Sequence, residues 1–353
     1  MKNQEKIFVI GHKNPDTDSI CSAIAYCDIK NRTTQESRYI PKRAGQINEE
    51  TEYVLNRFGV HPPGYLSNIG TQVKDMDIRL SPEANKSMSL KNAWDLMQEN
   101  SIVSLPIREK DGTLEGLITI GDIAKTYMDT TDSYLLSRAR TQYQRIAETI
   151  GGKVIEGNAH GYFIQGKVMV ATANPDKMKE YVKENDMVIM GNREEDHLQA
   201  IEQNVSCIIV GMGIEVTEKV LKLAHEKDIV IISSPYDTFT ISRLINQSIP
   251  VKYIMKTDNL VTFNTEDFTD DIQEVMIKHR HRAFPVINKK GKCIGTISRR
   301  NFLDMHRKKV VLVDHNEKDQ AVDNIDKADI MEIIDHHKLG TLQTMQPISF
   351  RNQ

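Results

Sequence analysis

The sequence predicts an α/β protein in which a parallel-sheet domain is interrupted by two copies of one small module and by a second α/β domain. Acidic residues and histidines directly follow apolar strand patterns near both ends of the chain. One segment recurs at constant spacing, and strand and helix patterns alternate between its two copies, which favours a mostly parallel sheet. A chain of 353 residues exceeds one ordinary core, so about two to four domains are expected.

The first strand pattern, Lys6–Ile10, ends in a loop of potential metal ligands. His12, Asp16 and Asp18 occupy this loop, and a helix with an apolar face beginning at Ile20 follows. Active sites of α/β proteins lie at the carboxyl ends of strands, and imidazole and carboxylate groups bind divalent metals. The competing interpretation is an ordinary loop histidine with aspartates that cap the helix.

Two strand patterns near the end of the chain finish in similar clusters. Lys309–Val313 leads into Asp314, and Met331–Ile334 leads into Asp335, His336 and His337. We expect the three strand ends to converge on one site for two metal ions. Such a site requires several ligands for each ion and one carboxylate that bridges both.

The internal repeat relates Met97–Asp122 to Met276–Asn301. In each copy the pattern predicts a helix, a strand, a glycine turn, a second strand and the opening of another helix. The expected helices are Leu90–Glu99 and Thr269–Lys278; the expected strands are Val103–Ile107, Leu114–Thr119, Ala283–Ile287 and Cys293–Ser298.

The end of each copy resembles the CBS module, in which a hydroxyl at a strand end and an acidic or amide side chain three residues later hold a ribose and phosphate. The corresponding pairs are Thr119 with Asp122 and Ser298 with Asn301. A helix N-terminus favours an anion at this place. The alternative is that these residues only cap helices. The resemblance implies a pair of modules that binds adenine nucleotides.

A basic run between the helix and the strand of the second copy includes Arg280 and Arg282. This run could lie next to the phosphates of a bound nucleotide, or it could be a solvated turn. Between the copies, the strands Lys167–Thr172, Met187–Met190, Cys207–Val210 and Ile229–Ser233 alternate with helices such as Thr217–Glu226. This region resembles the DRTGG domain, and we interpret it as a structural or dimerising spacer.

Composition limits the classes of function. The net charge is -3, with 46 basic and 49 acidic residues, so no global field favours a nucleic-acid backbone. We find no long apolar run and no signal peptide, and expect a cytoplasmic protein with no membrane partner. The four cysteines form no metal-binding pair, and we expect reduced, mostly buried thiols: Cys21, Cys27, Cys207 and Cys293.

The acidic motifs resemble those of the DHH phosphoesterases, and among them the manganese-dependent family II inorganic pyrophosphatases. The shared motifs are His-x-x-x-Asp-x-Asp from His12, Asp-His-Asn from Asp314 and Asp-His-His from Asp335. The family subtype with two CBS modules and an intervening DRTGG domain has the same order of segments. The resemblance implies hydrolysis of diphosphate to two phosphates.

The resemblance also implies residue roles. His12 and Asp16 would bind one manganese ion, Asp18 and His336 the other, and Asp314 both. His337 would contact the attacked or leaving phosphate, and Asp335 would orient its neighbours. Two ions would activate a bridging water and neutralise charge, and Mg²⁺ or Co²⁺ could replace Mn²⁺. Adenine nucleotides, namely AMP, ADP, ATP or diadenosine polyphosphates, would regulate a homodimer.

One departure from the family is that the sequence ends at Gln353, before the rest of the catalytic lobe. We therefore expect this chain to hydrolyse diphosphate poorly or not at all while still binding adenine nucleotides. Two alternatives remain: a DHH phosphodiesterase acting on short oligonucleotides or cyclic dinucleotides, and a nucleotide-sensing module without catalysis. The expected domains are catalytic residues 1–65, the first CBS module at 66–130, the DRTGG-like domain at 131–248, the second CBS module at 249–307 and further catalytic residues 308–353.

Overall fold

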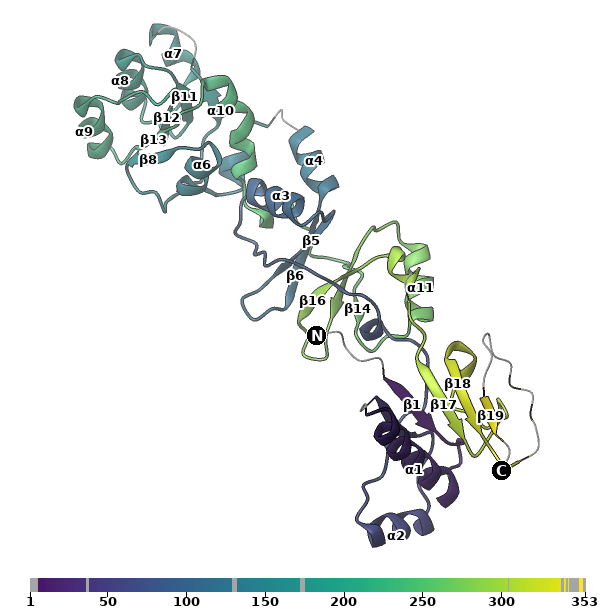
Figure 1. Cartoon of the computed structure of the whole chain (residues 1–353). Helices are drawn as coiled ribbons and strands as arrows, with labels where there is room; N and C mark the ends of the chain where they lie inside the picture. Colours follow the sequence, from purple (N-terminus) through teal and green to yellow (C-terminus); the bar gives the residue numbers. More distant parts are fainter. Residues whose placement is uncertain are drawn as a thin grey trace. The chain divides into compact units, whose positions relative to one another are not determined.

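The protein is described from a computed structural model that covers residues 6–35, 38–128, 132–171, 175–303, 305–337, 340, 342 and 349–351. The chain forms two compact units (Figure 1). Unit 1 comprises Met1–Ile78, Phe263–His281 and Ile297–Gln353, and unit 2 comprises Arg79–Thr262 and Arg282–Thr296. No helix among the described residues has the length and apolar character that crossing a membrane requires.

Unit 1 contains a parallel sheet with the strand order β19-β18-β17-β1-β2-β3. Its strands are β1 (Ile7–Ile10), β2 (Tyr39–Arg43), β3 (Gly64–Tyr65), β17 (Lys309–Val313), β18 (Asp329–Ile334) and β19 (Ser349–Arg351). The helices and short turns of this unit are α1 (Thr17–Thr34), α2 (Glu49–Phe58), α11 (Thr269–Lys278), η1 (Val73–Asp75), η4 (Arg299–Phe302) and η5 (Ile325–Lys327), with the short strand β14 (Phe263–Asn264). The N-terminal and C-terminal segments therefore build one sheet, as the sequence predicts.

The register of the central strands fixes where the site lies. Ile10 pairs with Leu312, and Val313 pairs with Ile334. Because the three strands are parallel and paired to their ends, the loops after β1, β17 and β18 leave from the same edge of the sheet. These are the loops in which the sequence places the metal ligands.

Helix α1 begins at Thr17, inside the segment predicted as a loop, so that Asp18 lies in its first turn. The helix is anchored by its apolar face. Asp16 is the N-cap, and its carboxylate accepts a hydrogen bond from the Ser19 backbone N–H at 2.9 Å. Ile20, Ala23 and Cys27 recur at helical spacing and are buried.

Unit 2 contains the first copy of the repeat and the strands of the second. The elements are β4 (Arg79–Leu80), α3 (Leu90–Glu99), β5 (Ser104–Arg108), β6 (Leu114–Thr119), α4 (Ile120–Met128), η3 (Val251–Tyr253), β15 (Phe284–Ile287) and β16 (Cys293–Ile297). Strands β5 and β6 pair antiparallel, as do β16 and β4. The helix, strand, turn and strand order predicted for each copy is therefore observed.

One expected helix is wrong in extent. The second copy was expected to open a helix after Ser298, as the first does after Thr119, but the structure has the 3₁₀ turn η4. Ile120 of the first copy corresponds to Arg299 of the second, and Gly121 to Arg300. The second copy thus has a charged residue where the first has the apolar Ile120, and most helical stability comes from packing an apolar face.

The rest of unit 2 is a small α/β domain. Its sheet has the order β10-β11-β12-β13-β8, parallel except for β8, and is built from β8 (Lys153–Glu156), β10 (Val168–Val170), β11 (Met187–Met190), β12 (Cys207–Val210) and β13 (Val230–Ser233). Surrounding elements are α5 (Leu135–Arg138), β7 (Thr141–Gln142), α6 (Tyr143–Thr149), β9 (Tyr162–Phe163), α7 (Pro175–Tyr181), α8 (Glu194–Glu202), α9 (Glu218–Glu226), α10 (Thr238–Leu244) and η2 (Ile245–Ser248). Thr172, the end of one expected strand, lies outside the described residues.

Both faces of this sheet are covered. Met187, Ile189 and Ile209 belong to one apolar core, and Val188 and Ile208 belong to another. Alternate residues of one strand therefore pack in different layers, which explains why β11 and β12 are continuous apolar runs. The cysteines are free; Cys27, Cys207 and Cys293 are buried and Cys21 is half-buried, as expected.

Candidate metal centre

Backbone contacts near β1 bring the first loop close to its own helix. A Cβ on Gly11 would lie 1.9 Å from the Ser19 hydroxyl oxygen, so only glycine allows this approach. The Ser19 hydroxyl accepts a hydrogen bond from the backbone N–H of His12 at 3.1 Å. Ser19 is fully buried and was not assigned a role from the sequence. It fixes the start of the loop that carries His12 and Asp16.

Asp314 lies at the centre of the cluster. It follows β17, and its carboxylate is almost completely buried. Its Oδ2 is 3.3 Å from His12 Nε2, and its Oδ1 is 3.9 Å from His336 Nε2. The two oxygens of one carboxylate thus face imidazoles from two different strand ends.

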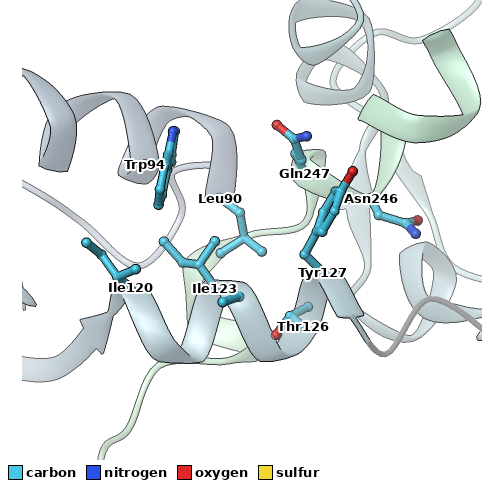
Figure 2. Close-up of a pocket in the computed structure, with 9 residues that line it drawn as sticks. Leu90, Trp94, Ile120, Ile123, Thr126, Tyr127, Asn246 and Gln247 are labelled. Atoms are coloured by element: carbon cyan, nitrogen blue, oxygen red, sulfur yellow. The ribbon is translucent and has the colours of Figure 1, made fainter. Parts of the chain in front are cut away.

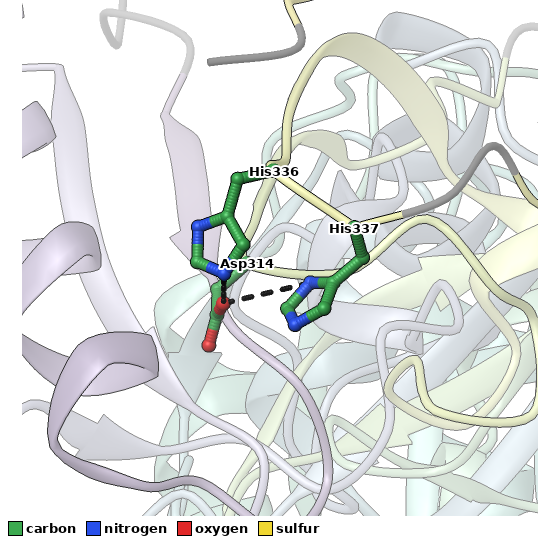
Figure 3. A group of neighbouring side chains, drawn as sticks. All are labelled: Asp314, His336 and His337. Carbon is green, nitrogen blue, oxygen red and sulfur yellow. Dashed lines mark ion pairs between the residues drawn. The ribbon is translucent and has the colours of Figure 1, made fainter.

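The remaining predicted ligands surround Asp314. His12 Nε2 lies 3.8 Å from Asp16 Oδ1, and His336 Nδ1 lies 3.9 Å from Asp18 Oδ2. His337 Nδ1 is 3.9 Å from Asp314 Oδ1, and Figure 3 shows both histidines directed toward this carboxylate. Two groups of metal-ligand atoms result, His12 with Asp16 and Asp314, and Asp314 with His336 and His337.

The electrostatics of the cluster favour a cation. Burial raises the pKa of the Asp314 carboxyl group, and the negative charges of Asp18 and Asp16 raise it further. Carboxylates held together in this way are stabilised when positive charge is placed among them. The mixed imidazole and carboxylate donor set fits Mn²⁺ or Co²⁺, which accept nitrogen and oxygen ligands.

Asp335 supports the cluster from behind. Its Oδ1 accepts hydrogen bonds from the backbone N–H of His337 at 3.1 Å and from the His337 ring at 2.6 Å, and its other oxygen accepts from the Asn316 amide. Burial alone would raise the pKa of Asp335, but these hydrogen bonds lower it. The Asp335 carboxylate in turn raises the pKa of His337. The Asp335 contacts agree with an orienting role.

His315, between Asp314 and Asn316, belongs to neither group of metal-ligand atoms. It is buried, its Nδ1 is 2.9 Å from the Val313 carbonyl oxygen, and burial lowers its pKa to about 4. Its neutral ring packs edge-on at 6.4 Å from the His12 ring, measured between centroids. Sequence reasoning gave this histidine no role, and in the structure its ring packs edge-on against that of His12.

A cavity of about 620 Å³ adjoins the first loop and offers room for a small anion. Its polar walls include Lys13, Asn14, Gln46 and Asp323, and Lys13 Nζ lies 2.8 Å from Asp323 Oδ1. Gly45 also lines the cavity, where a Cβ would lie 1.9 Å from the Lys13 carbonyl oxygen.

The predicted nucleotide residues occupy the turn that opens α4 and the 3₁₀ turn η4. In the first copy, Asp122 Oδ2 accepts from the Thr119 hydroxyl at 2.6 Å and from the Thr119 N–H at 3.0 Å. In the second copy, Asn301 Oδ1 accepts from the Ser298 hydroxyl at 2.8 Å and from the Ser298 N–H at 2.7 Å. The capping interpretation is therefore correct for the contacts within both turns.

Groups around these turns differ between the copies. Lys256 Nζ lies 3.4 Å from Asp122 Oδ1, whereas the Asn301 amide donates to the Asp77 carbonyl oxygen at 2.7 Å. Arg280 and Arg282 are exposed in the loop between α11 and β15, as their position in the sequence suggests.

Comparisons with known proteins agree with the division of the chain. The family model of the CBS domain matches residues 78–129 and 251–308, and that of the DRTGG domain matches residues 145–248. The chain is 39% identical over 351 residues to a protein of Clostridium perfringens named cobalt-dependent inorganic pyrophosphatase, covering 99% of this chain and 64% of that protein. It is 32% identical over 353 residues to a probable manganese-dependent inorganic pyrophosphatase of Thermotoga maritima, covering 100% of this chain and 64% of that protein.

A solved structure extends the likeness to three dimensions. It contains the CBS and DRTGG domains of the regulatory region of Clostridium perfringens pyrophosphatase, complexed with the activator diadenosine tetraphosphate. The TM-score is 0.62 and the sequence identity 34%, with 65% of this chain and 100% of the solved chain covered. This chain belongs to the family of inorganic pyrophosphatases with CBS and DRTGG domains.

The family assignment places both helix-opening turns within CBS domains. Thr119 and Asp122 fall in the first matched range, and Ser298 and Asn301 fall in the second. The pyrophosphatase relatives match the whole chain, including the strands that carry His12 and Asp314. The chain spans 64% of the length of each of these two relatives.

Proposed function

We propose that the Asp314 cluster is the metal centre of an inorganic diphosphatase, which hydrolyses diphosphate to two phosphates. The observation that carries the proposal is the position of Asp314, whose two oxygens face two separate groups of ligand atoms. A buried carboxylate shared in this way fits a bridge between two cations. Relatives named for cobalt and for manganese support Co²⁺ or Mn²⁺ as the metal.

We assign His12 and Asp16 to one ion, Asp18 and His336 to the other, and Asp314 to both. Bound divalent ions would supply a water of lowered pKa and neutralise charge on the phosphoryl oxygens. The protein's own contribution is to hold these ligands at the ends of three paired strands, so that little rearrangement accompanies binding.

His337 is the proposed contact to the substrate. Asp335 holds its ring by the 2.6 Å hydrogen bond and raises its pKa, so the ring is more readily protonated near neutral pH. With Nδ1 directed to Asp335, the second ring nitrogen, Nε2, carries the proton toward a phosphate oxygen. His337 thereby donates to the attacked or leaving phosphate.

The regulatory half of the proposal concerns the CBS domains. We propose that AMP, ADP, ATP or diadenosine polyphosphates bind at the turns containing Asp122 and Asn301, with Arg280 and Arg282 near the phosphates. The solved relative that contains diadenosine tetraphosphate supports this ligand class. We also propose that the protein is a homodimer and that its domains follow the boundaries predicted from the sequence.

Phosphate release tests the catalytic proposal. The chain is incubated with diphosphate or with a linear or cyclic dinucleotide, in Mn²⁺ or Co²⁺. We expect weak, metal-dependent release from diphosphate, no cleavage of the dinucleotides, and no activity in Asp314→Asn. Cleavage of the dinucleotides alone would favour the phosphodiesterase alternative. Calorimetry with AMP, ADP and ATP on the same samples tests nucleotide binding separately, so a sensor without catalysis gives a distinct result.

A further inference from the structure

Two cavities of the protein differ in the chemistry of their walls. The cavity between α3, α4 and η2 in unit 2 is lined mainly by apolar and aromatic side chains, among them Leu90, Trp94 and Ile123 (Figure 2). The cavity beside the first loop of unit 1 is lined by polar and charged side chains, including the ion pair of Lys13 and Asp323. Because Lys13 directly follows the metal-ligand candidate in the first loop, this ion pair bears on the metal centre.

The backbone of Lys13 joins the two loops that carry the first group of ligand atoms. That group consists of His12 and Asp16 from the loop after β1, and Asp314 from the loop after β17. The N–H of Lys13 donates to the Gln320 carbonyl oxygen at 2.7 Å. Gln320 belongs to the loop after β17, so this hydrogen bond ties the two loops together.

The side chain of Lys13 makes a second contact with the same loop. Its ammonium nitrogen, Nζ, lies 2.8 Å from Oδ1 of Asp323, and both side chains are accessible to solvent. Lys13 thus holds the loop after β17 through its backbone and through its side chain.

Asp323 is itself fixed by backbone and core contacts. Its N–H donates to the Ser67 carbonyl oxygen at 3.2 Å, and its carbonyl oxygen accepts from the Ile69 N–H at 3.0 Å. The preceding residue, Val322, is buried in the same apolar core as Ile10, the last residue of β1. Moving Asp323 would disturb these contacts, so Asp323 serves as the anchor and the loop after β1 is the part that it positions.

A third contact comes from the loop after β2. A Cβ on Gly45 would lie 1.9 Å from the Lys13 carbonyl oxygen and 2.6 Å from Pro15 Cδ. The backbone at Gly45 therefore packs directly on the ligand loop, and only glycine leaves room for this approach. Lys13 is held by contacts with two neighbouring loops.

The second group of ligand atoms does not share these contacts. It combines Asp314 with His336 and His337 from the loop after β18. Within the described part of the chain, the three contacts of Lys13 reach the loops after β17 and β2 and not the loop after β18. A change at Lys13 should therefore act on one ligand group and spare the other.

We propose that Lys13 is a positioning residue for one of two metal ions, the ion that His12 and Asp16 bind. Lys13 does not touch the ion. It holds the loop that carries these two ligands at the distance from Asp314 that a shared ion requires. The inference rests on the proposed metal centre and assigns the effect of Lys13 to one ion only.

Lys13→Met tests the proposal, because positioning and charge lead to opposite results. Removing a positive charge beside the cluster should by itself strengthen the binding of a cation. Losing the contact with Asp323 should instead weaken Mn²⁺ binding, by about 1.4- to 5-fold, the range for an exposed ion pair. Lys13→Arg keeps a cation that can pair with Asp323 and should restore the affinity. Calorimetric titration with Mn²⁺ measures these changes.

Two further variants separate the ions. Asp18→Asn removes a proposed ligand of the second ion. Asp16→Asn removes a proposed ligand of the first ion and keeps a side chain that caps α1. Lys13→Met should weaken Mn²⁺ binding in the Asp18→Asn background and leave it unchanged in the Asp16→Asn background.

Asp323→Asn should also weaken the first ion, and its effect combined with Lys13→Met should be smaller than the sum of the two, because both remove the same contact. The matched control is Asp319→Asn, which removes an exposed carboxylate of the same loop that does not pair with Lys13, and which should leave the affinity unchanged.

Gly45→Ala should have a larger effect on the first ion, about 10- to 100-fold, as found for residues that orient metal ligands. Its control is Gly64→Ala in the same sheet, where a Cβ would meet only the flexible end of the Lys42 side chain. Gly64→Ala should leave Mn²⁺ affinity unchanged.

Unchanged or tighter Mn²⁺ binding in Lys13→Met would overturn the proposal, as would an equal loss in the Asp18→Asn and Asp16→Asn backgrounds. If the unchanged chain binds no Mn²⁺, the proposed function fails instead, and NMR of the histidine rings in chelator decides the positioning role. Asp323→Asn should then shift the ring signals of His12 more than those of His336, and equal shifts would overturn the proposal.

Discussion

The Asp314 cluster of unit 1 and the polar contacts of unit 2 place their charged groups in opposite ways. Around Asp314 the chain gathers carboxylates and imidazoles from three strand ends and buries the central one. In unit 2, Asp122 is satisfied by Thr119 only three residues away, and Glu156 meets His225 at an exposed surface. The first arrangement concentrates negative charge that a bound cation would neutralise, whereas in the second each carboxylate already has a hydrogen-bond or ion-pair partner within the protein.

This difference predicts which substitutions should reduce function and which should reduce folding stability. Removing a carboxylate from the unit 1 cluster relieves repulsion between the remaining carboxylates, so the folded state is not destabilised. The same change removes a metal ligand, so it should lower metal affinity. Removing a group from a unit 2 turn takes away a cap and harms local stability instead.

The largest effect is expected for Asp314→Asn. Loss of a charge shared by both ligand groups should lower Mn²⁺ affinity by more than about 100-fold, since even residues behind the ligands contribute about 10- to 100-fold. Calorimetric titration with Mn²⁺ measures the affinity. Unchanged affinity would show that Asp314 does not bridge the ions.

The same variant should stabilise the metal-free protein at neutral pH. The raised pKa of Asp314 means that its contribution to stability is present below its unfolded pKa and is lost as pH rises through the folded pKa. Asparagine carries no charge and escapes this loss. Melting temperatures in chelator at pH 4 and pH 7.5 should therefore diverge between the two proteins only at the higher pH.

Asp335→Asn should act through His337. Without the carboxylate the pKa of His337 falls toward its ordinary value, and metal affinity or activity should fall by about 10- to 100-fold. Proton NMR titration of the histidine rings measures the pKa. Asp326→Asn, which removes an exposed carboxylate of the same unit, is the control and should change neither quantity.

Asp122→Ala should mainly affect stability. Loss of the two contacts that Asp122 accepts from Thr119 removes one half of the reciprocal capping interaction at the start of α4 and should cost about 0.3–1.5 kcal/mol of stability in unit 2. Urea unfolding measures this change. Mn²⁺ affinity should stay the same, and a large drop in it would contradict the separation of the two regions.

The smallest effect is expected for His225→Gln. Glu156 raises the pKa of His225, and His225 lowers that of Glu156, so their mutual stabilisation exists only between the two folded pKa values. It is lost as pH rises through the pKa of His225 and as pH falls through that of Glu156. Melting temperatures of the variant and the unchanged chain should differ slightly near pH 6 and converge toward pH 9.

Sequence reasoning succeeded where a pattern is local or where strands pair along their whole length. Helices α3 and α11, and strands β11 and β12, have the predicted bounds, because apolar periodicity and turn residues define them. The convergence of three strand ends also followed, because strands of a parallel sheet present their loops at one edge.

Other features depend on contacts that no pattern displays. The short turn η4 replaces a helix, and the Arg299 guanidinium donates to the carbonyl oxygens of Met276 and His279 at the end of α11. The packing of His315 and the pocket beside Trp94 arise only once separate segments are folded together. The burial and side-chain rotamer of these residues, rather than their residue type, determine which contacts they make.

Asp314 has a left-handed backbone conformation, with φ of 59°, immediately after β17. Glycine, asparagine and aspartate tolerate this conformation, whereas β-branched residues are strained in it. A library of all twenty residues at this position would therefore face two independent requirements. Glycine, asparagine and aspartate would keep the fold, whereas only aspartate and glutamate would keep a charge able to bridge two ions. Only the residue already present satisfies both.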